Sequence, residues 1–127
     1  MPYLCINNKN IYYREYGSGE RVIFLNGLMM STSSWAPFIN IFSREFKMIL
    51  VDLIDQGRSD SSGSEYLIDK NVEVLKEFLK LKGYDSVHIV GISYGGQVGQ
   101  LFTLKYPQMV KSLVLLNTTS EVDKNFA

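Results

Sequence analysis

The chain has 127 residues, enough for one domain, and its 13 lysine and arginine residues balance 13 aspartate and glutamate residues. Balanced charge without a block of one sign gives no electrostatic basis for nucleic-acid or membrane partners, and the single cysteine, Cys5, excludes an intrachain disulfide or a cysteine-based metal site. Because the start, MPYLCINNKN, lacks a basic leader and no apolar run could cross a bilayer, we expect a cytoplasmic protein that needs neither metal nor cofactor.

The predicted elements begin with an antiparallel hairpin in the first twenty residues, where YLCI and IYYREY flank NNKN, a segment suited to a turn. Cys5 is expected there as a small buried side chain. Four short apolar runs follow: VIFL at 22–25, MILV at 48–51, VHIV at 87–90 and LVLL at 113–116. They are continuously apolar rather than alternating, which is typical of strands covered on both faces.

Helical periodicity separates these strands. The segment SSWAPFINIFSREF predicts a helix capped by Ser34, with one apolar side made of Trp35, Phe38, Ile39, Phe42 and Phe46. A second helix is predicted in LIDKNVEVLKEFLKLKG and ends at Gly83; a third follows Ser93 and ends at Tyr106, because Pro107 disfavours helical geometry before it. This alternation predicts an α/β domain over residues 1–127: a mostly parallel sheet with helices on both faces and an N-terminal antiparallel hairpin.

The most informative short motif is IVGISYGG at residues 89–96. Gly91 and Gly95 stand two residues on either side of Ser93. The pattern Gly-x-Ser-x-Gly alone is weak, but here it follows a predicted buried strand and opens a predicted helix. That context is typical of a nucleophile elbow, a sharp turn that exposes a serine hydroxyl.

A second motif, VIFLNGLMMS, leaves the strand at 22–25 through Asn26, Gly27 and Leu28. If this backbone lies close to the elbow, the amides of Leu28 and Tyr94 can both point at a developing oxyanion. Met29 and Met30 follow, either as walls of an apolar acyl pocket or as core filling.

Together these motifs resemble the N-terminal part of the α/β-hydrolase superfamily. The resemblance runs from YYREYGSGERVIFLNGLMMSTSSW through ILVDLIDQGRSD and VHIVGISYGGQ to YPQMVKSLVLLNTT, nearly the whole chain. It implies an incomplete α/β-hydrolase fold, a nucleophile at Ser93 and oxyanion donors at the amides of Leu28 and Tyr94. The sequence departs from the family pattern at Asn26, where histidine is common, and at Asp55-Gln56-Gly57, where a Gly-His-Gly-like turn is more usual.

The family also places a triad acid and a histidine after the serine, and the sequence given contains neither in the expected order. Its single histidine, His88, lies on the strand that leads into Ser93 and is expected to be a packed or hydrogen-bonded strand residue. The resemblance therefore predicts a serine hydrolase acting on an ester or thioester through an acyl-enzyme at Ser93, with little activity in this chain alone. The alternative is a catalytically silent, truncated hydrolase fold that serves as an interaction module.

The sixth predicted strand, in VKSLVLLNTT at 110–119, has no successor in the sequence to pair with its far side. It contains no proline and one charge, Lys111. An unprotected apolar edge is a template for another chain, so we expect self-association or a C-terminal complement at this strand, alongside a small-molecule acyl substrate.

Overall fold

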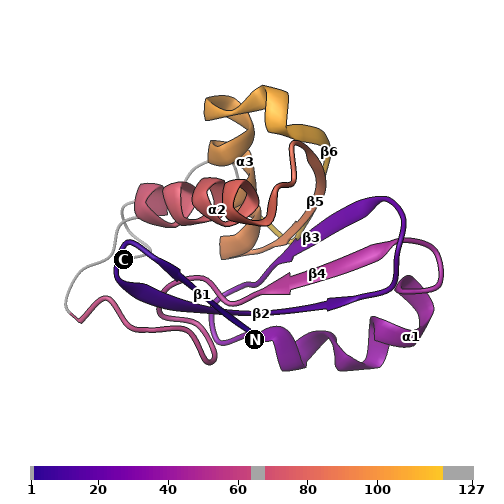
Figure 1. Ribbon diagram of the computed structural model, residues 1–127, viewed down its shortest axis with the longest axis horizontal. Helices are drawn as coiled ribbons and strands as arrows, with labels where there is room; N and C mark the ends of the chain where they lie inside the picture. The colour runs from indigo at the N-terminus through magenta and orange to yellow at the C-terminus, as the bar shows by residue number, and fades with distance from the viewer. Residues whose placement is uncertain (1, 64–67, 119–127) are drawn as a thin grey trace.

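A six-stranded sheet organises the part of the chain that the computed structural model describes, residues 2–63 and 68–118 (Figure 1). The strand order is β1-β2-β4-β3-β5-β6. The antiparallel neighbours are β1 with β2 and β2 with β4, whereas β3 runs parallel to β4 and β5, and β5 runs parallel to β6. The strands are β1 (Tyr3–Ile6), β2 (Lys9–Tyr16), β3 (Arg21–Leu25), β4 (Lys47–Val51), β5 (Val87–Ile92) and β6 (Val110–Leu116). The predicted fold class is confirmed.

Helices cover both faces of this sheet, as Figure 1 shows with α2 and α3 on one side and α1 on the other. Successive residues of a strand point to opposite faces, so each apolar run serves two cores. Ile23 and Ile49 pack in the core shared with α2 and α3, whereas Phe24 and Leu50 pack with Trp35 on the other face. The helical elements are η1 (Thr32–Phe38), α1 (Ile39–Phe42), α2 (Ile68–Lys82), α3 (Tyr94–Lys105) and η2 (Pro107–Met109).

The first predicted helix differs from expectation. It is a 3₁₀ helix, η1, followed by four residues of α-helix, α1, and its N-cap is Ser31 rather than Ser34. The Ser34 hydroxyl instead accepts a hydrogen bond from the Ser31 amide at 3.1 Å. Pro37 lies inside η1 and has no N–H to give to an α-helical hydrogen bond, which accounts for the tighter, interrupted geometry.

The hairpin forms as predicted, with a shorter turn. Asn7 and Asn8 have φ angles of 51° and 65°, and Lys9 already belongs to β2. A two-residue turn with positive φ at both positions fits the right-handed twist of the two strands that it joins. Asparagine adopts positive φ more readily than most residues. Cys5 is exposed, not buried as expected, because it lies on the outward-facing side of the edge strand β1.

The two long helices end where the sequence predicts. Gly83 follows α2 with a φ of 74°, and the Tyr106 amide closes α3 with a hydrogen bond to the Phe102 carbonyl at 2.7 Å. Within residues 2–63 and 68–118, none of the helices combines the length and the apolar character needed to cross a membrane.

Candidate active site

Ser93 occupies the corner between β5 and α3 and is exposed. Its φ of 53° and ψ of −119° are unusual for a residue with a side chain, and such backbone strain costs about 1–3 kcal/mol. Hydrogen bonds hold it in place. The Ser93 amide donates to the Leu116 carbonyl at 3.0 Å, while the Ser93 carbonyl accepts from the Gly96 amide at 2.9 Å and the Thr118 hydroxyl at 2.7 Å.

The flanking glycines are required by close backbone contact. A Cβ on Gly91 would lie 2.6 Å from the Gly95 carbonyl oxygen. A Cβ on Gly95 would collide with the Leu25 carbonyl and lie 2.7 Å from the carbonyl oxygen of Asn26. The first turn of α3 therefore packs directly against the end of β3, and the sharp turn at Ser93 follows from that approach.

The loop after β3 lies beside the serine. A Cβ on Gly27 would lie 3.1 Å from the Ser93 Cβ, so Leu28 follows immediately after the point of contact. Among the described residues, no group accepts a hydrogen bond from the amide of Leu28 or of Tyr94, the two predicted oxyanion donors. Within the described part of the chain, both amides therefore lack a protein acceptor, and Ser93, which Tyr94 follows directly, is exposed.

The two methionines of this loop have different environments. The Met29 side chain is fully exposed. Met30 packs on the core that contains Trp35, and its Sδ accepts a hydrogen bond from the Gly27 amide at 3.3 Å. The Met30 amide in turn donates to the Gly27 carbonyl at 3.2 Å, so Met30 fixes the bend that carries Leu28.

Asn26, the first departure from the family pattern, is the centre of a buried polar network. Its Oδ1 accepts a hydrogen bond from Trp35 Nε1 at 2.7 Å, and its Nδ2 donates to Asp52 Oδ1 at 2.9 Å and to the Val51 carbonyl at 3.2 Å. The indole N–H can only donate, which fixes the orientation of the amide. The loop is therefore hydrogen-bonded without a histidine at this position.

The second departure, Gln56, bonds directly to the first. Gln56 Nε2 donates to the Asn26 carbonyl at 3.1 Å, and Gln56 Oε1 accepts from the Leu53 amide at 3.0 Å. Asp52 lies between the two loops and accepts hydrogen bonds from the Thr32 amide at 2.8 Å and the Arg58 amide at 3.1 Å. Burial raises the pKa of Asp52, while these hydrogen bonds act in the opposite direction.

Sequence reasoning did not single out Asn71, which anchors the side chain of Tyr94, next to Ser93. Asn71 is buried on α2; its Oδ1 accepts from the Ile54 amide at 3.0 Å and its Nδ2 donates to the Tyr94 hydroxyl at 3.0 Å. Burial raises the pKa of Tyr94. The sequence does hold one sign of this role: Asn71 is a polar residue on the otherwise apolar, buried side of α2.

His88 does not contact Ser93. Its Nδ1 lies 2.7 Å from Ser112 Oγ and its Nε2 lies 3.3 Å from Glu20 Oε2, so it is a hydrogen-bonded strand residue as the sequence indicates. Within the described part of the chain, no group of three or more histidine, cysteine, aspartate or glutamate side chains is placed to hold a metal ion.

Comparisons with known proteins place this geometry in a family. The sequence profile described as alpha/beta hydrolase fold matches residues 20–127. A 2-hydroxy-6-oxononadienedioate/2-hydroxy-6-oxononatrienedioate hydrolase of Paraburkholderia phymatum is 37% identical over 114 residues, covering 84% of this chain and 39% of the relative. A 2-hydroxy-6-oxo-6-(2'-aminophenyl)hexa-2,4-dienoic acid hydrolase of Metapseudomonas resinovorans is 31% identical over 114 residues, covering 87% of this chain and 39% of the relative.

A crystal structure shows the same fold. MGS-M2, an alpha/beta hydrolase enzyme from a Medee basin deep-sea metagenome library, superposes with a TM-score of 0.92 at 35% identity, covering 96% of this chain and 46% of that one. The chain thus spans less than half the length of these proteins. On the match over residues 20–127, the chain belongs to the alpha/beta hydrolase family.

Proposed function

We propose that the chain carries the nucleophile of a serine hydrolase that acts on an ester or thioester. The observation that carries this proposal is the exposed Ser93 at a φ of 53°, beside Gly27. In the proposed reaction Ser93 Oγ attacks the substrate carbonyl carbon and forms an acyl-enzyme, which water then hydrolyses. The amides of Leu28 and Tyr94 donate to the negatively charged oxygen of the tetrahedral intermediate, a contribution that is typically worth about 10²- to 10³-fold in rate per donor.

The proposal also needs a base and an acid, which the described residues, 2–63 and 68–118, do not place at Ser93. A serine is a weak nucleophile until a base removes its proton, and the single histidine is held by Ser112 and Glu20. We infer that a polypeptide segment outside this sequence supplies the histidine and the acid. The share of the relatives that the chain covers, 39–46%, supports this inference.

The strand β6 is the place where such a segment would add. It pairs with β5 on one side and ends the strand order of the described sheet. Three apolar side chains of β6, Val114, Leu115 and Leu116, are 48%, 40% and 42% exposed. The proposed occupant is therefore a further strand with its covering helices, or a second copy of this chain where that segment is missing.

A second candidate substrate class is a 2-hydroxy-6-oxo dienoic acid. Two relatives above 30% identity carry such acids in their names, which favours this class over esters. The same attack by Ser93 on the ketone would break the adjacent carbon–carbon bond, with water supplying the hydroxyl of the new carboxylic acid and the proton of the released carbon. A silent interaction module remains the alternative from another class of function.

A fluorophosphonate probe and two substrates test these proposals. In the completed protein the probe should label Ser93, and Ser93→Ala should abolish both labelling and turnover of a nitrophenyl acyl ester, while the exposed-loop control Ser61→Ala retains both. The 127-residue chain alone should turn over the ester little or not at all. Turnover of a 2-hydroxy-6-oxo dienoic acid at a higher kcat/KM than the ester would select the second substrate class. Absence of labelling in the completed protein would favour the silent module.

A further inference from the structure

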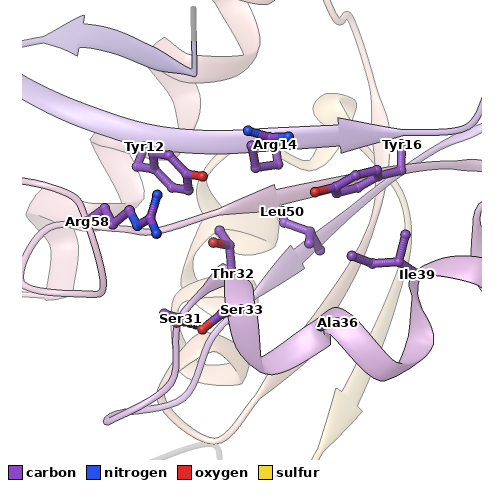
Figure 2. A pocket seen from close by; sticks show the side chains of 10 residues that line it. All are labelled: Tyr12, Arg14, Tyr16, Ser31, Thr32, Ser33, Ala36, Ile39, Leu50 and Arg58. Atoms are coloured by element: carbon purple, nitrogen blue, oxygen red, sulfur yellow. Dashed lines mark hydrogen bonds between the residues drawn. The ribbon is translucent and has the colours of Figure 1, made fainter.

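A cavity of about 220 Å³ lies on the face of the sheet that η1 and α1 cover, and Ser93 is not among the residues that line it (Figure 2). Its upper wall in Figure 2 is β2, from which Tyr12, Arg14 and Tyr16 project on one face of the strand. Arg58, from the loop after β4, enters from the side, and Ser31 and Ser33 form the opposite wall. Two arginine side chains from distant parts of the sequence therefore line one cavity.

Neither guanidinium forms an ion pair with a carboxylate in the described residues. Two acidic side chains of the same segments have other partners: Glu15, next to Arg14 in sequence, pairs with Lys82 at 3.0 Å, and Asp52 accepts the backbone N–H of Arg58. The positive charge of Arg58 does lower the pKa of Asp52, but burial of that carboxyl has the larger, opposite effect. The cavity consequently retains a positive charge that protein carboxylates do not neutralise directly.

Aromatic rings hold the two arginine side chains. The Arg58 guanidinium lies 5.3 Å from the centroid of the Tyr12 ring, and the Arg14 guanidinium lies 5.9 Å from that of Tyr16. The hydroxyl of Tyr16 also stabilises charged Arg14 and raises its pKa. A guanidinium has five N–H donors in a planar fork that matches carboxylate and phosphate oxygens, so Arg14 has donors beyond those that the hydroxyls of Tyr16 and Tyr12 occupy.

The cavity is small, and two serine hydroxyl groups also line it. Ser31 Oγ and Ser33 Oγ lie 2.7 Å apart and share one hydrogen bond, which leaves one hydroxyl proton free to donate elsewhere. The volume of about 220 Å³ is below the roughly 300–1,000 Å³ of pockets for drug-sized ligands. The size and the donors together suit a small anion rather than a large organic molecule.

We propose that the cavity between Arg14 and Arg58 binds the oxyanion group of a small ligand, a phosphate or a carboxylate, at a site separate from Ser93. Arg14 lies on β2 and Arg58 in the loop after β4, so the cavity lies toward the end of the sheet away from β6. A strand that pairs with the outer edge of β6 therefore does not itself reach the cavity, and Ser93, Leu28 and Tyr94 are not among the residues that line it.

Calorimetric titration of the full chain with inorganic phosphate, and separately with malonate, tests the site at about 0.15 M salt. We expect saturable binding of one equivalent of at least one of the two anions. The double variant Arg14→Gln/Arg58→Gln should weaken it at least tenfold, whereas Arg44→Gln, an exposed arginine of the segment after α1, should change it less than twofold. Saturation by phosphate alone or by malonate alone supports the site and assigns the anion class.

A charge-preserving variant separates recognition from general attraction. Arg14→Lys/Arg58→Lys retains both charges but loses the planar forks, so binding should weaken less than in the double glutamine variant but by more than the Arg44→Gln control. Far-UV circular dichroism confirms that each variant is folded, and a double glutamine variant that fails to fold is replaced by the two single variants. Non-saturable binding of both anions, or equal weakening by Arg44→Gln, would overturn the proposal.

Discussion

Replacing Asn26 by alanine should cost about 3–4 kcal/mol of unfolding free energy. The substitution removes the acceptor of the Trp35 indole N–H and one donor to the Asp52 carboxylate, both inside the protein. Each buried polar group left without its partner costs about 1–3 kcal/mol, so the two together give about 2–6 kcal/mol. The middle of that range is expected because Asp52 keeps its hydrogen bonds from the amides of Thr32 and Arg58.

Urea unfolding followed by far-UV circular dichroism measures this loss, and a double-mutant cycle isolates one contact. Trp35→Phe retains most of the ring contact with Phe24, whose centroid lies 4.9 Å from the indole, but removes the N–H. Asn26→Ala and Trp35→Phe should therefore be coupled by about 1–2 kcal/mol. Asn26→Asp keeps an acceptor for Trp35 but faces Asp52, so it should be destabilised at pH 7 and recover at acid pH. A cost below about 1 kcal/mol for Asn26→Ala would refute this account of the network.

Three further predictions concern the elbow, a buried tyrosine and the edge strand. Gly95→Ala should destabilise by about 3 kcal/mol or more, because the new Cβ meets backbone of Leu25 and Asn26 that cannot yield. Burial and a hydrogen bond to Glu15 raise the pKa of Tyr84 from 10.0 to about 12. Between those pH values the unfolded chain releases a proton that the folded chain keeps, so the unfolding free energy should fall as pH rises from 10 to 12, and Tyr84→Phe should flatten this slope. The isolated chain should sediment as a dimer or larger species at micromolar concentration, and Val114→Lys should shift it toward monomer.

The glycine and edge-strand predictions each have a matched control within the chain. A Cβ on Gly99, in the same helix as Gly95, would meet side-chain atoms and not backbone, the Leu113 Cδ1 at 3.1 Å and the Ile89 Cγ2 at 3.3 Å, so Gly99→Ala should cost less than Gly95→Ala. Ile41→Lys places the same charge on an exposed residue of α1 and should leave sedimentation unchanged. Equal costs for the two glycine variants, an unchanged slope in Tyr84→Phe, or a monomer at all concentrations would each contradict the corresponding prediction.

The fold was largely readable from the sequence because burial of β3 and β4 on both faces leaves a strong local pattern; the apolar run of β6, also expected to be covered on both faces, is instead largely exposed. Four continuous apolar runs coincide with β3, β4, β5 and β6, and the order of turns and helices between them determines a parallel topology. Local patterns were less informative where a proline interrupts a helical period and where burial depends on the position of a strand in the sheet. The aromatic period of residues 35–46 predicts one helix, but Pro37 interrupts it, and the exposure of Cys5 follows from the edge position of β1, which no local pattern reveals.

The site was readable only in part, because its support is long-range. Ser93 and its glycines stand in one octapeptide, and their strained geometry follows from the strand–turn–helix order alone. The partners of Asn26, by contrast, come from residues 35, 51, 52 and 56, which are adjacent only because β3 and β4 are parallel neighbours. Asn26 and Gln56 each look like an isolated departure in the sequence, and the structure shows that they contact each other.

This pairing bears on how the loop beside Ser93, the proposed nucleophile, is held without the histidine that is common at position 26. A histidine there could both donate and accept, but its charge would change near neutral pH. The amides of Asn26 and Gln56 make the same kinds of contact and do not titrate, so the loop that carries Leu28 is held equally from acid to neutral pH. The remaining titratable group of the network, Asp52, binds a proton more readily when folded because burial raises its pKa. Since the folded state then binds more protons than the unfolded chain, Asp52 favours folding more as the pH falls through its titration range. Any loss of Ser93 reactivity at acid pH should therefore come from the base that activates it and not from collapse of the loop.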